Sequence, residues 1–169
     1  KNNFFEKAFQ PNVVRFCFLQ AHYRSVLDIS NEAMLASEKG LNRLLEGVKL
    51  IASIQAKSTS TFSVSEWIQS CYDAMNDDFN TPILIASLFE GVRFINLLND
   101  NSASLTAEDL KLFTDSISTF VFEVLGLKDE KAVENNNETL EGVINMLIGM
   151  RNEARANKDF AMSDQIRNQ

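Results

Sequence analysis

The chain has 169 residues, of which 23 are acidic and 16 are basic, and its net charge at pH 7 is −7. A composition that is 45% apolar and 23% charged is typical of a globular protein and excludes a disordered, collagen-like or disulfide-scaffold class. Neither a membrane-spanning run nor the pattern of a secretory signal is recognisable, so we expect a cytoplasmic protein with no membrane partner.

The N-terminal part of the sequence predicts two helices. With only six glycines and two prolines, we expect an all-α fold, a helical bundle of about five to seven helices. Pro11 is suited to the first turn of a helix that runs through Arg24. After a short extended piece over 26–29, Ser30 is placed to cap a long helix over 31–57. Residues 58–61 read as a loop.

Capping signals mark the starts of the next helices. Ser63 and Glu66 have the spacing of a capping box, and apolar residues follow at helical intervals. After a turn, Thr81 as N-cap and Pro82 at the first helical position predict a helix that ends near residue 98.

The last third of the chain predicts further helices and a linker. Leu105 and Leu110 flank a start signal at 106–109 in the manner of a hydrophobic staple, and this fifth helix stops at Gly126. A charged linker over 128–138 follows, then a sixth helix over 140–156. Asp159 is placed to cap a seventh helix that the end of the sequence interrupts, so we expect the chain to be a piece of a longer protein.

The charge is unevenly distributed along the chain. Residues 1–57 carry +3, residues 58–139 carry −10 and residues 140–169 are neutral. The acidic total therefore reflects the middle of the chain, and the two ends could still meet a polyanion. A solvated surface with no partner explains the same distribution.

We find no catalytic signature. Phosphate-binding glycine loops, nucleophile elbows and zinc-type cysteine pairs are absent from the sequence. Cys17 and Cys71 lie on apolar helix faces, which predicts buried free thiols, and His22, the single histidine, predicts a packing residue. Asp77 and Asp78 are interpreted as turn and capping residues and not as a catalytic pair.

Three residues near the end form a candidate nucleic-acid site: Arg155, Phe160 and Asp164. Phe160 and Asp164 are four apart and share a helix face, and Arg155 arrives from the preceding helix. An aromatic ring can stack on an unpaired base, a carboxylate can accept from base amino groups and an arginine can donate to phosphate. The alternative is a core Phe160 and a surface ion pair between Asp164 and Arg155 or Arg167.

Several segments together resemble the cysteinyl-tRNA synthetases. Each is unspecific alone, but all occur in the family's order and cover nearly the whole chain. They are Val14-Arg15-Phe16, Ala21-His22-Tyr23-Arg24-Ser25 with Leu27-Asp28 and Asn31-Glu32-Ala33, Glu38-Lys39-Gly40-Leu41, Asp78-Phe79-Asn80-Thr81-Pro82, and Lys158-Asp159-Phe160-Ala161 with Ser163-Asp164 and Ile166-Arg167.

The resemblance implies part of a class I ligase that joins cysteine to its tRNA with ATP. Residues 1–28 resemble the end of the family's stem-contact region, 29–157 its helical anticodon-binding (DALR) bundle, and 158–169 the start of a C-terminal anticodon-contact segment. The arginine of the DALR name falls at Arg15, although the preceding letters differ. No catalytic, cofactor or metal residue is assigned here, because the family's ATP and zinc sites belong to an N-terminal catalytic domain.

The resemblance also implies residue roles and a partner. Arg155, Phe160 and Asp164 match the family's anticodon-binding residues, and cysteine tRNA is the expected partner of a monomeric protein. Arg15, His22, Tyr23 and Arg24 are possible tRNA stem contacts, with packing at the junction the preferred role of the last three. Two alternatives stay open: a helical scaffold for partner proteins, and a fragment of the related cysteine ligase of mycothiol synthesis, which resembles only part of the pattern.

Overall fold

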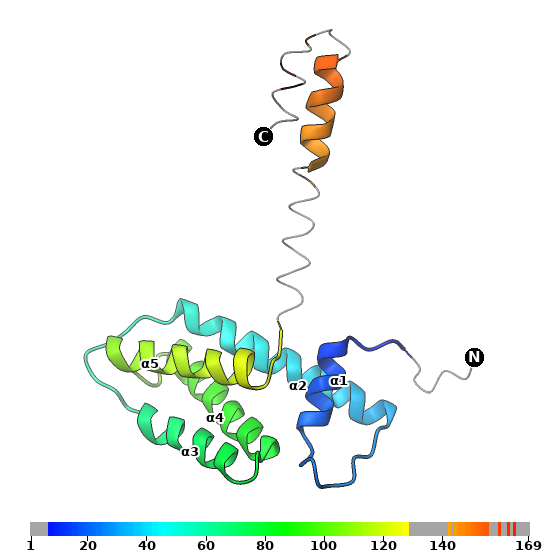
Figure 1. Ribbon diagram of the computed structural model, residues 1–169. Coiled ribbons are helices and arrows are strands. Elements are labelled where there is room, and N and C mark those ends of the chain that lie inside the picture. Colours follow the sequence, from blue (N-terminus) through cyan, green and yellow to red (C-terminus); the bar gives the residue numbers. More distant parts are fainter. Residues whose placement is uncertain are drawn as a thin grey trace. The chain divides into compact units, whose positions relative to one another are not determined.

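The computed structural model describes residues 7–128, 142, 144–155, 159, 162 and 164. The chain divides into two compact units, Lys1–Lys128 and Asp129–Gln169. Helices make up all the regular structure of the described residues, which confirms the all-α prediction (Figure 1). The helices of the first unit are α1 (Pro11–Leu19), α2 (Asn31–Leu50), α3 (Val64–Asn76), α4 (Thr81–Asn99) and α5 (Ala107–Ser118), with a 3₁₀ turn η1 (Ile51–Ser53) and a π-helical segment η2 (Thr119–Val124).

Three helices begin at the predicted N-caps. The side chains of Ser30, Ser63 and Thr106 each accept a hydrogen bond from the backbone N–H three residues further on, at 3.2, 3.4 and 3.2 Å. Each bond satisfies one of the N–H groups that a helix start leaves without an intrahelical acceptor. These caps fix where α2, α3 and α5 start.

Helix α1 is shorter than predicted. It ends at Leu19, and the N–H groups of Gln20 and Ala21 donate to carbonyls three residues back, which tightens the last turn. The prediction that the helix continues to Arg24 is wrong, because residues 22–24 bond instead to the turn between α3 and α4. The predicted long second helix likewise ends early, at Leu50, and continues only as η1.

Two further helix boundaries differ from the sequence pattern. Asn80, not Thr81, is the N-cap of α4, and its side chain makes no capping bond. The fifth helix widens after Ser118, where the Leu125 N–H donates to the Phe120 carbonyl five residues back. Gly126 then takes a φ of +61°, as its predicted role as the left-handed cap requires.

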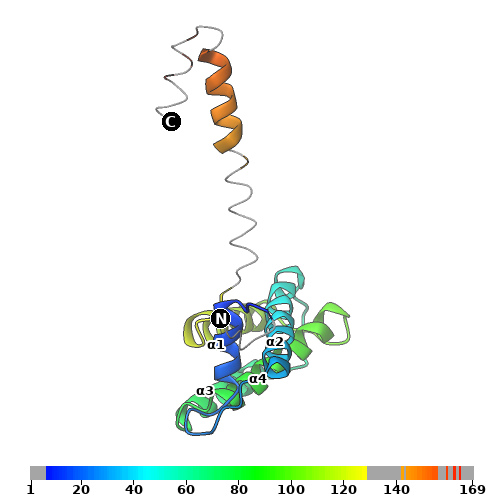
Figure 2. The same ribbon diagram turned by 90° about the vertical axis from the view of Figure 1, so that its right-hand side faces the viewer.

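Helix α4 is the central helix of the first unit. It contacts α1, α2 and α3, and Figures 1 and 2 show α1 lying against α2 on one side of it. By length and composition α4 could cross a membrane, since its mean hydropathy reaches 1.4 over eighteen residues. A buried core helix passes the same test, and nine α4 residues are buried against their neighbours.

An aromatic cluster fills the space between α3, α4 and α5. The edge of Trp67 meets Phe113 at a centroid distance of 4.8 Å, and Phe62 stacks on Phe94 at 4.0 Å. The Trp67 Nε1–H donates to the Ser87 carbonyl at 2.8 Å, so the indole is buried without an unsatisfied donor.

Two glycines let the neighbours of α4 approach closely. A Cβ at Gly47 of α2 would lie 2.5 Å from Cγ1 of Val92, and a Cβ at Gly91 of α4 would lie 3.0 Å from Cζ2 of Trp67. Because both partner side chains belong to the packed core, neither can yield without disturbing it.

Helix α1 is tied to the end of the π-helical segment. The buried Asn12 side chain donates to the Lys128 carbonyl at 2.5 Å and accepts from the Lys128 N–H at 3.1 Å. One turn further, Arg15 Nη1 donates to the Gly126 carbonyl at 2.5 Å. The two side chains satisfy the backbone groups that follow η2 and hold the last part of the first unit against α1.

The described part of the second unit is helical over 144–155, within the predicted sixth helix. Beyond it, the Asp159 N–H donates to the Ala154 carbonyl at 2.8 Å, and its carboxylate accepts from the Met162 N–H at 3.0 Å. Asp159 thus has the capping role that the sequence predicts. The predicted linker lies outside the described residues beyond Lys128.

We expect Gly47→Ala to lower the free energy of unfolding by about 1–3 kcal/mol, because the new methyl group overlaps Val92. Chemical denaturation measures the change. In the Val92→Ala background the cost of the glycine substitution should shrink, since the overlapping methyl groups are gone. Gly149→Ala is the control, because no atom lies within 4 Å of a Cβ there. An equal cost in both backgrounds contradicts the packing argument.

Cys71 provides a pH test of burial. Both cysteines are buried and free, as predicted, and desolvation raises the pKa of Cys71 from its ordinary value of 9.0 to about 12. Between these values the unfolded chain loses the thiol proton and the folded chain keeps it, so stability falls as pH rises from 9 to 12. Between pH 8 and 11, we expect the wild type to lose on the order of 1–3 kcal/mol more stability than Cys71→Ala in urea unfolding. Parallel losses contradict the assignment.

Candidate functional site

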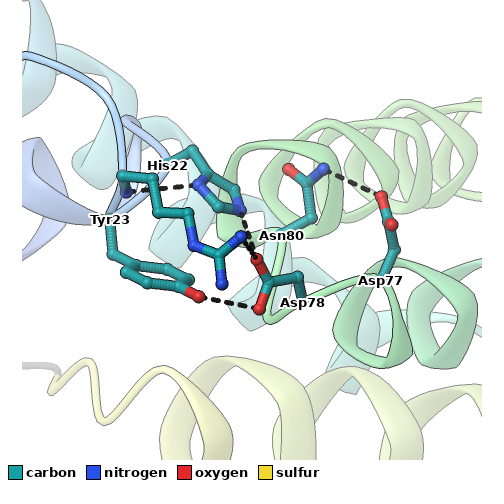
Figure 3. Close-up of polar contacts among 6 residues, drawn as sticks. His22, Tyr23, Asp77, Asp78 and Asn80 are labelled. Carbon is teal, nitrogen blue, oxygen red and sulfur yellow. Dashed lines mark hydrogen bonds and ion pairs between the residues drawn. The ribbon is translucent and has the colours of Figure 1, made fainter.

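Two segments of the family resemblance meet at one carboxylate. Residues 21–25 follow α1, and residues 78–82 join α3 to α4, more than fifty residues later. Asp78 is the point of contact between them, and Figure 3 shows His22 and Tyr23 turned toward it.

Asp78 interacts with three consecutive side chains. The Tyr23 hydroxyl donates to Oδ1 at 2.7 Å, and Arg24 Nη1 lies 3.1 Å from Oδ2. His22 Nε2 lies 4.0 Å from the same Oδ2. The carboxylate therefore clamps the segment after α1 to the turn before α4.

The three side chains also contact one another. The His22 ring stacks on the Tyr23 ring at a centroid distance of 4.7 Å, and the Arg24 guanidinium lies 5.3 Å from the Tyr23 centroid. The Arg24 backbone N–H donates to His22 Nδ1 at 3.3 Å. Because Nδ1 accepts, the proton of a neutral His22 is assigned to Nε2, the nitrogen that faces Asp78.

Asp78 also shapes the pKa of Tyr23. The hydrogen bond to the Asp78 carboxylate is the main cause that raises the pKa of the phenol above 10.0, with desolvation and the negative charge of Asp78 adding to it. Tyr23 therefore remains a neutral hydroxyl that can donate. The arrangement is a hydrogen-bonded clamp and offers no activated base or nucleophile.

The turn that carries Asp78 has an unusual backbone. Asp78 and Phe79 have φ values of +56° and +54°, in the left-handed region that L residues other than Asn and Asp seldom adopt. The turn is held by bonds from the N–H groups of Phe79 to Met75 and of Asn80 to Ala74, at 3.1 and 3.0 Å. Asn80 Nδ2 also donates to Asp77 Oδ2 at 3.2 Å, as Figure 3 shows.

A shallow groove of about 360 Å³ lies beside the clamp. Its walls come from the end of α1, the segment after it and the turn before α4, and their side chains are mostly apolar or aromatic. Phe79 and Tyr23 in this groove are 67% and 62% exposed, and Phe18 is also exposed.

The four residues predicted as possible stem contacts all have partners inside the first unit. Arg15 bonds to the Gly126 carbonyl, and His22, Tyr23 and Arg24 surround Asp78. These contacts give each of the four a structural role. Contact of any of them with a tRNA stem stays a prediction.

The predicted anticodon residues lie in the second unit. Arg155 is exposed at the end of the helix over 144–155, and Asp164 is exposed and helical beyond the Asp159 cap. Phe160 lies outside the described residues. Arg155 and Asp164 thus flank a capped turn, and their role in binding stays a prediction.

No group of three or more potential metal ligands among His, Cys, Asp and Glu occurs in the part of the chain that the structure describes. Another groove, of about 290 Å³, is lined by η1, the segment after it and the end of α4. Neither groove contains a set of side chains suited to acid–base or nucleophilic chemistry.

The sequence pattern does not predict the tertiary contacts of Asp78 and Asn12. Asp78 is predicted as a turn residue, and it lies in a turn, but it also bonds to Tyr23 and Arg24, more than fifty residues earlier in the sequence. The sequence pattern does not single out Asn12, in the first turn of α1, although an amide that is buried needs a hydrogen-bond partner. Both residues contact residues that are far away in the sequence, and the periodicity of apolar residues does not predict such contacts.

Comparisons with known proteins fit this architecture. The model of the DALR domain matches residues 71–129, from the middle of α3 to the end of the first unit. The cysteine–tRNA ligases of Bacteroides thetaiotaomicron, Bacteroides fragilis and Parabacteroides distasonis are 48%, 45% and 43% identical to the chain over 96%, 96% and 97% of its length. The chain spans about a third of the length of these relatives, 34%, 33% and 34% respectively.

The helical bundle around α4 is therefore a DALR domain. More particularly, the chain belongs to the cysteine–tRNA ligase family and corresponds to the C-terminal part of its members. The motif segments that meet at Asp78 thus lie in the region that the family shares.

The clamp predicts coupling between Tyr23 and Asp78. Tyr23→Phe and Asp78→Gly should together cost less stability than the sum of the single changes, because either change removes the same hydrogen bond. Glycine suits the left-handed backbone at residue 78, so the substitution removes the carboxylate without new strain.

A double-mutant cycle by urea denaturation measures this coupling. Tyr72→Phe is the matched control, because the Tyr72 ring faces Phe120. Its effect should add to that of Asp78→Gly. Equal coupling for both tyrosines contradicts the clamp.

Proposed function

We propose that the chain is the tRNA-binding part of a cysteine–tRNA ligase, which joins cysteine to cysteine tRNA with ATP in the cytoplasm. The observation that carries the proposal is 48% identity to a cysteine–tRNA ligase over 96% of this chain. ATP, cysteine and zinc would bind in a catalytic part that this sequence does not include, so the role of the chain is to position the tRNA. We expect a monomer.

The charge distribution favours one surface for the RNA. The stretch with a net charge of −10, residues 58–139, includes α3, α4 and α5. A polyanion is repelled by such a surface, whereas residues 140–169 are neutral and carry Arg151 and Arg155. The end of the helix over 144–155 is therefore a better place for anticodon contact than the acidic bundle.

Local structure at this end supports the same assignment. Asp159 bonds to the Ala154 carbonyl on one side and to the Met162 N–H on the other, so that Arg155 precedes this cap and Asp164 follows it in sequence. Both side chains are exposed. We propose that Arg155 donates to phosphate or to a base acceptor, that Phe160 stacks on an anticodon base and that Asp164 accepts from a base amino group.

The test uses the full-length ligase. Phe160→Ala should weaken tRNA binding by about 1–3 kcal/mol, the usual value of a base stacked on an aromatic ring. Arg155→Ala and Asp164→Ala should raise the KM for cysteine tRNA in aminoacylation. All three should leave cysteine-dependent ATP–pyrophosphate exchange unchanged, because that reaction needs no tRNA.

The controls separate binding from folding and from charge. Arg93→Ala and Glu153→Ala remove exposed charges of each sign outside the proposed site and should not change the KM for tRNA. Loss of both reactions alike would show a folding defect and count against the residue roles. A protein that joins cysteine to a small molecule and ignores tRNA would overturn the proposed function.

A further inference from the structure

The groove beside the Asp78 clamp exposes aromatic and aliphatic side chains that no part of residues 7–128 covers. Phe18, Tyr23 and Phe79 line it, together with Leu19 and Leu27. Next to it, Val26 is 98% exposed. Isolated exposed apolar residues are ordinary on a protein surface, but a contiguous set around a concavity marks an interaction site.

Phe79 is the most informative residue of the groove. Its backbone is held at a φ of +54° by the bonds of the turn, while its ring is 67% exposed. A non-glycine residue in this conformation is strained. Packing within the first unit offsets little of this strain, because the exposed ring is not part of the packed core. Contact with something outside the unit would explain an aromatic residue at this position.

The charges around the groove argue against RNA as its occupant. The carboxylates of Asp77 and Asp78 lie on the turn that forms one wall, and Arg24 is already paired with Asp78 at 3.1 Å. A phosphate backbone would be repelled by the carboxylate of Asp77 and would have to compete with Asp78 for Arg24. A protein surface with apolar side chains, and a basic group opposite Asp77, fits the groove better.

We propose that this groove, defined by Phe18, Leu19, Tyr23, Leu27 and Phe79, is the docking surface for the preceding part of the same ligase polypeptide. The chain spans about a third of its relatives and corresponds to their C-terminal part, so most of the protein comes before it. Most of the residues that line the groove lie within the first thirty residues, close to that point, and consecutive parts of a chain are usually neighbours in space.

In this arrangement the clamp holds the two walls of the groove together. Asp78 ties the segment after α1 to the α3–α4 turn, so that both walls of the groove belong to one rigid surface. An apolar centre with polar side chains at its edge is the usual composition of an interface between domains. The clamp thereby sets the orientation of the DALR bundle relative to the part that precedes it. The proposal depends on the chain being part of a longer ligase and not on its binding tRNA.

Hydroxyl-radical footprinting tests the proposal, because it reports the solvent exposure of individual aromatic side chains. Oxidation of Phe18, Tyr23 and Phe79 should be several-fold slower in the full-length ligase than in this chain alone, with no tRNA present. Tyr72, which is 52% exposed on α3, should react equally in both proteins and serves as the internal control. Trp67, buried in the core, reports that both are folded.

A variant distinguishes docking from indirect effects. Phe79→Asn removes the ring and places a residue that tolerates the left-handed backbone, so the isolated chain should stay folded. In the full-length ligase, this variant should restore oxidation of Phe18 and Tyr23. Leu112→Gln, at an exposed position of α5, should not.

Three results would overturn the proposal. Equal oxidation of the groove in both proteins would show that the preceding part does not cover it. Protection that appears only when tRNA is added would make RNA the occupant, and protection of the isolated chain that grows with concentration would make it a second copy. Because the decisive comparison contains no tRNA, failure of the docking proposal is distinguishable from failure of the proposed tRNA function.

Discussion

The close packing of α4 against its neighbours is the constraint on which the rest of the first unit depends. Gly47 lets α2 approach Val92, and Gly91 lets Trp67 of α3 pack closely against α4. The indole then bonds to the Ser87 carbonyl, which fixes α3 along the length of α4. Because the turn between these helices is only four residues long, its conformation follows from their packing. The left-handed backbone of Asp78 and Phe79 is thus imposed by the core.

The position of Asp78 in turn fixes the segment after α1. Its carboxylate ends that helix early by engaging Tyr23 and Arg24, and Asn12 and Arg15 tie the same helix to the last residues of the unit. Helix α1 is therefore held at both ends by polar contacts over long sequence distances. Each exposed pair contributes little to the stability of the fold. The bonds of the buried Asn12 matter more, because they satisfy both the N–H and the carbonyl of Lys128, and a buried backbone group without a partner is costly.

Local signals in the sequence account for most of the helices. Ser30, Ser63 and Thr106 fix helix starts through bonds to residues three positions away, so the capping pattern was sufficient to predict them. The end of α1 and the widened turn of η2 were not predictable in this way. The end of α1 depends on the contacts with Asp78. The widened turn of η2 accompanies the burial of Phe120, Leu125 and Leu127. The two motif segments were recognisable by resemblance, but their meeting at Asp78 depends on tertiary structure.

The fold shows which helices carry the acidic residues of the chain. The acidic residues belong mainly to the stretch that forms α3, α4 and α5, and Asp77 and Asp78 belong to the turn whose Phe79 lines the apolar groove. A ligase that binds a polyanion gains from such a surface, because repulsion removes RNA orientations that would cover the bundle or its junction. The proposed anticodon contact at Arg155 and the proposed protein contact at Phe79 would then be separate functions, on surfaces whose local charge suits each partner. The net charge of −7 is therefore no measure of RNA affinity in this chain.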